Sequence, residues 1–563
     1  MRNTRLIDWK IGVCAAVVAL SGACVDLNVT NLNDPDRERA LSSGNDVESL
    51  ISGGFQAWWQ TSHHSYPAAA MSTAADAHSS SWGNWGMRDA GWEPRKSYNN
   101  DPAYSYNNLA ESPWLFSYRT LAAVRDGLLT LNGDTDQAQL MRDELGAERT
   151  ERLNAFAKYL QAMSLANLAL IFDQAFIVDE SVDDIAGLEM QPYTAVWAAA
   201  EQKFAEVIQM ASGGSFVIPA AWVAFNRDWS APYMAELARA YRARFATQIA
   251  RTPSERDGLD WSAILADASG GLSQTFAGYY EEGGNWAWAR AKHHTAHYTG
   301  WARIDYRTVG PSDASGKWEE WINASADAKR PFDIDTDDRR ITAGDPKMSG
   351  TYIRYMGNSP FPADRGIYHY SNYIDWRWRP LFDNGWVGEY PDMTAMELEF
   401  IAAEANYRLG NRDAAMETVN KYRARGELPP FTDANGVAPG GDRCVPQMAD
   451  GSCGTLWDAL KYEKRVEVFH YGFATEYFDD RGWGDLVEWT WEQVPVPGSE
   501  LLILLMDIYS FGGPGGNSSA GDASAMSAYL NNTDMQTLTS KLFALRWWDR
   551  ANLESTDHEP TRH

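Results

Sequence analysis

The sequence predicts a mainly α-helical fold in which helical hairpins pack against an irregular, loop-rich region with short strands. Three observations support this prediction. Apolar residues recur at helical spacing in several segments, and glycine and aromatic residues crowd the segments between them. One aromatic-rich segment alternates instead, which favours a strand.

The best-defined hairpin is predicted over residues 394–426. Its first helix carries an apolar stripe at positions i, i+3, i+4, i+7 and i+11, formed by Leu398, Ile401, Ala402, Ala405 and Leu409. A second stripe that includes Phe400 predicts packing from more than one direction. Gly410 suits the left-handed end of this helix, and Asp413 is placed to cap the next one. A hairpin of about 34 residues with small residues at its close contacts is typical of a tetratricopeptide repeat.

Further repeats are expected, because such a hairpin cannot bury its faces alone. Ala-rich and aromatic-rich helical patterns recur around residues 150–172, 192–251 and 455–482. Stacked repeats commonly merge, so residues 24–563 are expected to form a single body. An irregular all-helical core with chance periodicity is the alternative that the pattern alone leaves open.

Four motifs carry a resemblance to a known family. They are EFIAAEANYRLG at 399–410, NKYRAR at 420–425, EKRVE at 463–467 and DDRGWG at 479–484. In this order they resemble the C-terminal half of the SusD/RagB family of outer-membrane nutrient-binding lipoproteins. VPVPGSEL at 494–501 resembles a later family segment. The family's Gly-x-Arg after the third motif and its final Gln-Asn-Pro-Gly-Tyr stretch are absent, so residues 512–563 are an atypical tail.

The resemblance implies a SusD-like fold and a protein that is not an enzyme and has no cofactor. It implies capture of oligosaccharides, or of peptides, at the cell exterior and their transfer to a SusC-like TonB-dependent outer-membrane barrel. A surface glycan hydrolase on a helical scaffold and a protein-binding repeat scaffold are the alternatives. No nucleophile elbow, P-loop or Cys/His nucleophile setting is evident in the sequence.

The N-terminus resembles a lipoprotein export signal. Residues 1–23 combine a basic start with a short apolar run, and small residues precede Cys24. Acylation of Cys24, as in palmitate-bearing lipoproteins, would anchor the chain to the outer membrane, with residues 24–36 as a tether. An ordinary signal peptide cleaved near Ala23 is the alternative.

The overall charge restricts the partners. The formal net charge is −27. A strongly acidic chain is a poor partner for nucleic-acid phosphates and for anionic lipid surfaces.

The ligand is expected at the loop-rich segments around 62–113 and 270–390, where family members place most ligand contacts. Flat aromatic faces, an amide and a guanidinium suit sugars, and the same surfaces suit peptides. The candidate ligand-binding residues are Trp82, Asn84, Trp85, Arg88, Trp286, Trp288 and Trp301. The alternating segment near the end of this region predicts a small sheet containing Tyr368, Tyr370, Trp376 and Trp378.

Cys444 and Cys453 lie in a Gly-, Asp- and Pro-rich loop. In an exported chain this favours a disulfide over free thiols or a metal site.

Three further groups of charged or histidine residues have features of functional sites. Asp333, Asp335 and Asp337 have the first spacing of a calcium loop but lack its later Gly and Glu, so Asp–Arg pairing is predicted. His293, His294 and His297 lack the flanking Glu of a zinc helix, and no metal is expected there. The charged residues of the last two motifs are interpreted as a structural network between two helices; they are Glu463, Lys464, Arg465, Glu467, Asp479 and Arg481.

Overall fold

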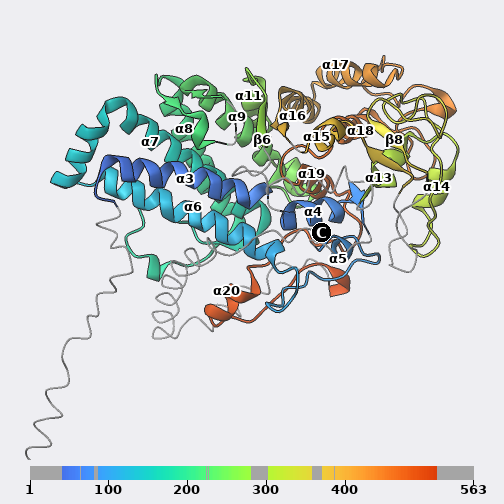
Figure 1. The fold of residues 1–563 in the computed structure, drawn as a ribbon. Helices are drawn as coiled ribbons and strands as arrows, with labels where there is room; N and C mark the ends of the chain where they lie inside the picture. The colour runs from blue at the N-terminus through green and yellow to red at the C-terminus, as the bar shows by residue number, and fades with distance from the viewer. Residues whose placement is uncertain are drawn as a thin grey trace, which may run out of the picture.

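The computed structural model describes residues 41–63, 65–80, 86–223, 225, 227–280, 302–357, 371–385 and 387–515 (Figure 1). Most of these residues form helices that pack in succession along the molecule. The long helices are α3(Gly44–His63), α6(Asn108–Asn132), α7(Asp136–Ile171), α8(Tyr193–Ser212), α9(Ala231–Gln248), α11(Trp261–Ser269), α16(Ala395–Arg408), α17(Arg412–Arg423), α18(Leu456–Glu467) and α19(Thr475–Trp483).

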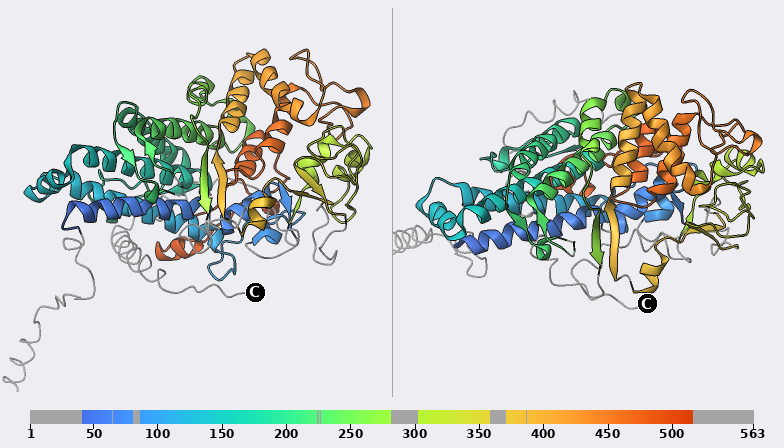
Figure 2. Two further views of the ribbon diagram at one scale, coloured as in Figure 1. Left: turned by 45° about the horizontal axis from the view of Figure 1, so that its top comes forward. Right: turned by 90° about the horizontal axis from the view of Figure 1, so that it is seen from above.

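Each helix of this row packs on the next. α7 packs on α8, α8 on α9, α9 on α11, α11 on α16, α16 on α17 and α17 on α18, while α3 and α6 cover α7. The views in Figure 2 show this row running from the cyan helices at one end to the orange helices at the other. The predicted mainly helical fold is confirmed.

The predicted hairpin is formed by α16 and α17. Gly410 has φ +87°, the left-handed conformation expected of the residue that ends a helix. Thr394 caps α16 by accepting a hydrogen bond from the Glu397 amide. The prediction that Asp413 caps α17 is wrong, because α17 begins at Arg412 and places Asp413 within its first turn. There its carboxylate still lies near the positive end of the helix dipole.

The apolar stripe of α16 is only partly buried. Leu398, Ile401 and Ala405 are buried, whereas Leu409 at the end of the helix is 41% exposed. The stripe is covered where α9, α11, α17 and α18 cross it.

The short strands form two-stranded antiparallel pairs. The pairs are β1(His78–Ser79) with β7(Arg303–Ile304), β2(Gln174–Ala175) with β3(Gln191–Pro192), β4(Val217–Ile218) with β5(Trp229–Ser230), β6(Phe276–Tyr280) with β10(Gly388–Met393), and β8(Ile353–Tyr355) with β9(Tyr373–Asp375). The predicted strand is therefore shorter than expected. Trp376 and Trp378 follow β9 instead of lying in it, and Tyr368 and Tyr370 lie outside the described residues.

Short helices and turns connect these elements. They are α4(Ser65–Ala74), α5(Met87–Ala90), α10(Pro253–Asp257), α13(Tyr306–Val309), α14(Lys317–Ile322), α15(Arg379–Asp383), α20(Gly498–Ile503) and the 3-10 turns η2(Ile185–Gly187), η3(Ala220–Trp222), η5(Gly310–Ser312), η7(Ala424–Gly426), η8(Gly441–Arg443) and η9(Gly513–Gly515). In the described ranges, no helix is both long enough and apolar enough to cross a membrane.

The charged residues of the last two motifs take part in buried ion pairs, but only some of these pairs join the two helices as predicted. Arg340 is fully buried and binds Asp338, Glu463 and Glu467. Lys464 pairs with Asp479 at 2.7 Å, which joins α18 to α19.

Arg481 was predicted to belong to the charged network between two helices, but it binds backbone carbonyls instead. Its guanidinium donates hydrogen bonds to the backbone carbonyls of Leu170, Gln248 and Glu492. Because the side chain is buried, desolvation lowers the pKa of Arg481. Arg481 thus connects α19 to the C-terminal ends of α7 and α9.

Candidate functional site

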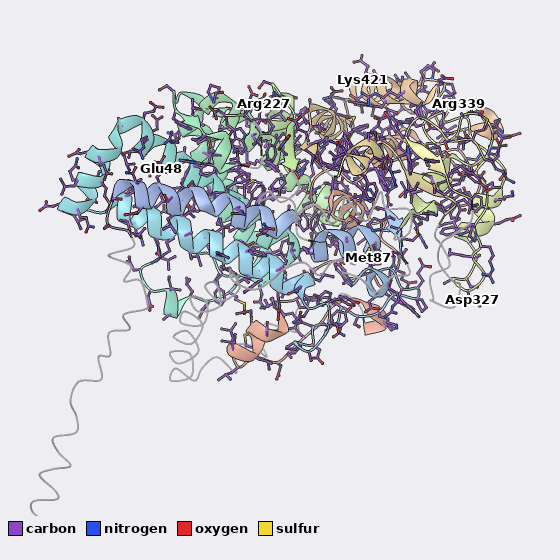
Figure 3. The ribbon with its side chains drawn as sticks, in the orientation of Figure 1. Glu48, Met87, Arg227, Asp327, Arg339 and Lys421 are labelled. Carbon is purple, nitrogen blue, oxygen red and sulfur yellow. A yellow bond between two sulfur atoms is a disulfide. The ribbon has the colours of Figure 1, made fainter. Side chains whose placement is uncertain are left out.

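The short helix α5 positions the one predicted ligand-binding residue that the structure describes, Arg88. Gly86 precedes α5 with φ +72° and lets the chain turn into the helix. Gly91 follows α5 and lies so close to α4 that an added Cβ would stand 2.8 Å from Cγ2 of Thr73. Met87, the first residue of α5, is buried, and Figure 3 labels it below the long helices. Arg88 is left on the outer side of α5, with 43% of its side chain exposed.

Arg88 belongs to a small polar and aromatic cluster. Its Nε lies 3.3 Å from Oδ1 of Asp89, and the Tyr104 hydroxyl donates to Oδ2 of Asp89 at 2.5 Å. Burial and then this hydrogen bond raise the pKa of the Tyr104 phenol well above its usual range. The rings of Tyr104 and Tyr106 meet edge to face with centroids 5.6 Å apart. The cluster combines a guanidinium, a carboxylate and aromatic faces, which are groups that hydrogen-bond and stack on sugars.

The loop that follows α5 is fixed to the C-terminal part of the described chain. The buried guanidinium of Arg95 donates to Oδ2 of Asp76 at 2.6 Å and to Oγ1 of Thr490 at 2.9 Å. Trp92 remains partly exposed, and Nζ of Lys96 lies 4.4 Å from the centre of its ring. The hydrogen bonds of Arg95 therefore hold this loop in place beneath its exposed face.

The other predicted site residues fall outside the described residues. These are Cys24, Trp82, Asn84, Trp85, Trp286, Trp288 and Trp301, and their roles stay predictions. The structure adds Asp89, Tyr104 and Tyr106, which the sequence analysis did not single out. The available signal was the aromatic run YSYNN, which lies in the same loop-rich segment, 62–113.

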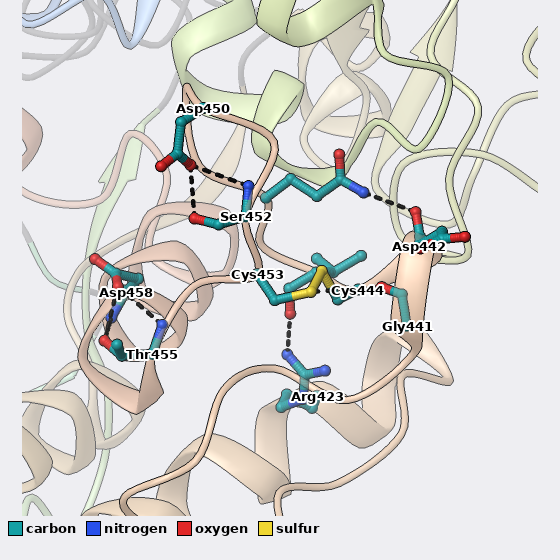
Figure 4. Close-up of a disulfide and its surroundings, with 11 residues drawn as sticks. Arg423, Gly441, Asp442, Cys444, Asp450, Ser452, Cys453, Thr455 and Asp458 are labelled. Atoms are coloured by element: carbon teal, nitrogen blue, oxygen red, sulfur yellow. Dashed lines mark hydrogen bonds between the residues drawn. A yellow bond between two sulfur atoms is a disulfide. The ribbon is translucent and has the colours of Figure 1, made fainter.

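The two cysteines form a disulfide, the pairing that their loop favours, with Cα atoms 5.8 Å apart (Figure 4). Nη1 of Arg423 donates to the carbonyl of Val445 at 2.6 Å, and this holds the bridged loop against the end of α17. Within the loop, the Asp450 carboxylate accepts hydrogen bonds from the amide and hydroxyl of Ser452.

We expect replacement of both cysteines by alanine to lower the free energy of unfolding by about 2–3 kcal/mol, because the bridge removes the loop-closure entropy of a short loop from the unfolded chain. Guanidinium unfolding of the Cys444→Ala/Cys453→Ala variant measures the loss. Dithiothreitol should destabilise the unmodified protein to a similar extent and leave the variant unchanged. An equal effect of dithiothreitol on both proteins would contradict this assignment.

The aspartates near residue 335 form ion pairs with an arginine side chain. Arg443 binds Asp335 and Asp337 through four hydrogen bonds of 3.0–3.1 Å. Hydrogen bonding to Arg443 lowers the pKa of Asp335. The predicted Asp–Arg pairing is thus confirmed, with a partner about a hundred residues away in the sequence. Among the described residues, no group of three or more His, Cys, Asp or Glu side chains is arranged to hold a metal ion. His293, His294 and His297 lie outside them.

No family model and no curated protein matches the chain. Across most of its length the chain is similar to solved structures of SusD-superfamily proteins. One, from Parabacteroides distasonis, is 12% identical with a TM-score of 0.48, over 77% of this chain and 88% of that one. A SusD homologue from Bacteroides thetaiotaomicron is 13% identical with a TM-score of 0.45, over 83% and 92%. A SusD-like carbohydrate binding protein from Bacteroides vulgatus is 14% identical with a TM-score of 0.44, over 77% and 82%.

Proposed function

We propose that this protein is a surface lipoprotein that captures oligosaccharides and passes them to a SusC-like TonB-dependent barrel in the outer membrane. The observation that carries the proposal is the cluster of Arg88 and Asp89 on α5 with Tyr104, beside the loop that Arg95 fixes. The cluster lies next in sequence to the predicted contact residues Trp82, Asn84 and Trp85. The cluster offers hydrogen-bonding charged groups beside aromatic rings, which is the chemistry that oligosaccharides require.

The row of packed helices would serve as the rigid support of this site. Its buried ion pairs join segments that are distant in the sequence, as Arg256 of α10 does with Glu404 of α16 and Arg340 with Glu463 of α18, so the loops can change without loss of the fold. Acylation at Cys24 would hold the body at the cell surface, and the barrel would supply the energy for import.

Arg88→Ala is expected to weaken oligosaccharide binding about tenfold, because a charge-assisted hydrogen bond to a sugar hydroxyl would be lost. Quenching of tryptophan fluorescence by a panel of soluble oligosaccharides first identifies a ligand, and calorimetry then compares the two proteins. Arg227→Ala is the matched control, since Arg227 is an exposed arginine in a distant part of the structure (Figure 3). Equal losses in both variants would count against a ligand site at α5.

Further measurements separate the alternative functions. If the protein binds oligopeptides but no oligosaccharide, its ligand is a peptide and not a glycan. Release of reducing ends from a glycan by the purified protein alone would favour a hydrolase. Purification of the lipoprotein from native membranes with a co-eluting barrel tests the proposed partner.

A further inference from the structure

A cavity apart from the α5 cluster is lined by residues of α14, α18, α19 and the disulfide-bridged loop. Its volume is about 370 Å³, within the range of small-molecule sites. One wall is mainly apolar and is formed by Pro311, Trp318, Ile322, Pro446 and Met448. The last two belong to the loop that the Cys444–Cys453 bridge closes.

The rest of the lining is largely charged. α18 contributes Asp458, Lys461 and Arg465 at positions i, i+3 and i+7, so that the three residues share one helix face. Asp480 of α19 and Asp485 also belong to this part of the lining. With Asp76 and Arg307 included, the lining has more acidic than basic side chains.

The ion pairs in this part of the lining leave one carboxylate oxygen available. Lys461 donates to both oxygens of Asp485 at 3.1 and 2.9 Å. Nε and Nη2 of Arg465 both donate to Oδ1 of Asp480, at 3.1 and 2.7 Å. Within the described part of the chain, no donor lies within hydrogen-bond distance of Oδ2 of Asp480, although only 9% of this side chain is exposed.

Asp480 lines the cavity, so an oxygen of its carboxylate that accepts no hydrogen bond from the protein can accept one from a ligand. An ammonium group supplies up to three donors and a positive charge that offsets the excess of acids. The apolar part of the lining, which includes the ring of Trp318, suits a compact ring-shaped body beside that charge.

We propose that this cavity binds a small organic cation, a primary ammonium group on a compact ring such as that of an amino sugar, with the ammonium held by Asp480 and the ring against Trp318 and Met448. This site does not depend on the function proposed for the α5 cluster.

The charge on Asp480 gives the site a pH dependence. Burial raises the pKa of Asp480 to about 7 against the opposing effect of Arg465. A protonated Asp480 no longer attracts an ammonium group, so cation binding should weaken as the pH falls below about 7. The other charged or titratable groups facing Asp480 are Asp76, Arg307, Asp458, Lys461, Tyr462, Lys464, Arg465, Asp479 and Asp485.

Benzylamine and its neutral analogue benzyl alcohol test the proposal by calorimetry on the mature protein, and glucosamine and glucose form a second matched pair. We expect each amine to bind at least tenfold more tightly than its neutral partner at pH 7.5. Benzylamine affinity should fall at least threefold at pH 5.5. Asp480→Asn should reduce benzylamine binding at least tenfold and abolish its pH dependence.

Three controls make the result specific. Asp257→Asn removes an exposed carboxylate from a surface ion pair and should leave binding unchanged. Ala449→Trp should block the cavity while it keeps Asp480, and unfolding midpoints establish that each variant is folded. Arg88→Ala should not affect benzylamine. Equal binding of amine and alcohol, absence of amine binding, or undiminished binding by both Asp480→Asn and Ala449→Trp would overturn the proposal.

Discussion

Replacement of Arg340 by methionine is expected to lower the free energy of unfolding by about 3–5 kcal/mol, because breaking a buried ion pair leaves uncompensated buried charge. The guanidinium of Arg340 is fully buried and lies 2.7 Å from Asp338, 2.6 Å from Glu463 and 2.9 Å from Glu467. The pKa of Glu463 is already raised by burial, so loss of Arg340 should leave this carboxyl to take up a proton at higher pH. Urea unfolding monitored by circular dichroism measures the change.

Arg443 supplies the matched control for this prediction. It makes four hydrogen bonds to two aspartates, but 41% of its side chain is exposed. Exposed ion pairs contribute little, so Arg443→Met should cost less than about 1 kcal/mol. A similar cost for the two variants would show that burial is not the factor that decides the effect.

Trp229→Ala is expected to lower the free energy of unfolding by about 3–5 kcal/mol, since it removes a large buried side chain and leaves a cavity. The indole is fully buried, and its ring centre lies 5.7 Å from that of Phe55, 5.9 Å from Tyr159 and 5.6 Å from Phe276. It therefore joins α3, α7 and β6 in one aromatic core. Differential scanning calorimetry and urea unfolding both report the loss.

Trp489→Ala is the corresponding control. This side chain is 38% exposed, and its replacement should change stability by less than about 1 kcal/mol. The comparison also bears on the high tryptophan content. Trp58, Trp59, Trp114 and Trp229 are among the largest fully buried side chains, so part of that content builds the core and does not serve a ligand site.

The residues of the candidate site could be predicted only in part from the sequence. Arg88 could be chosen because it follows a Trp-rich, Gly-rich stretch without helical periodicity. Tyr104 could not be assigned to it, because its contact with Asp89 depends on how the loop after α5 folds back. Asp480 and residues 446–449 of the disulfide-bridged loop likewise line one cavity only in the folded chain.

The sequence by itself determined the local elements. Apolar spacing places α16 and α17 and the turn at Gly410, and the composition of their loop favours pairing of the two cysteines, because helix periodicity and loop chemistry are properties of neighbouring residues. Only the tertiary structure decided which charges meet. Arg340 pairs with Glu463, which lies 123 residues away in the sequence, and Arg443 pairs with Asp335, which lies 108 residues away. Such pairs depend on the packing of elements that are distant in the sequence, and no local pattern encodes that packing.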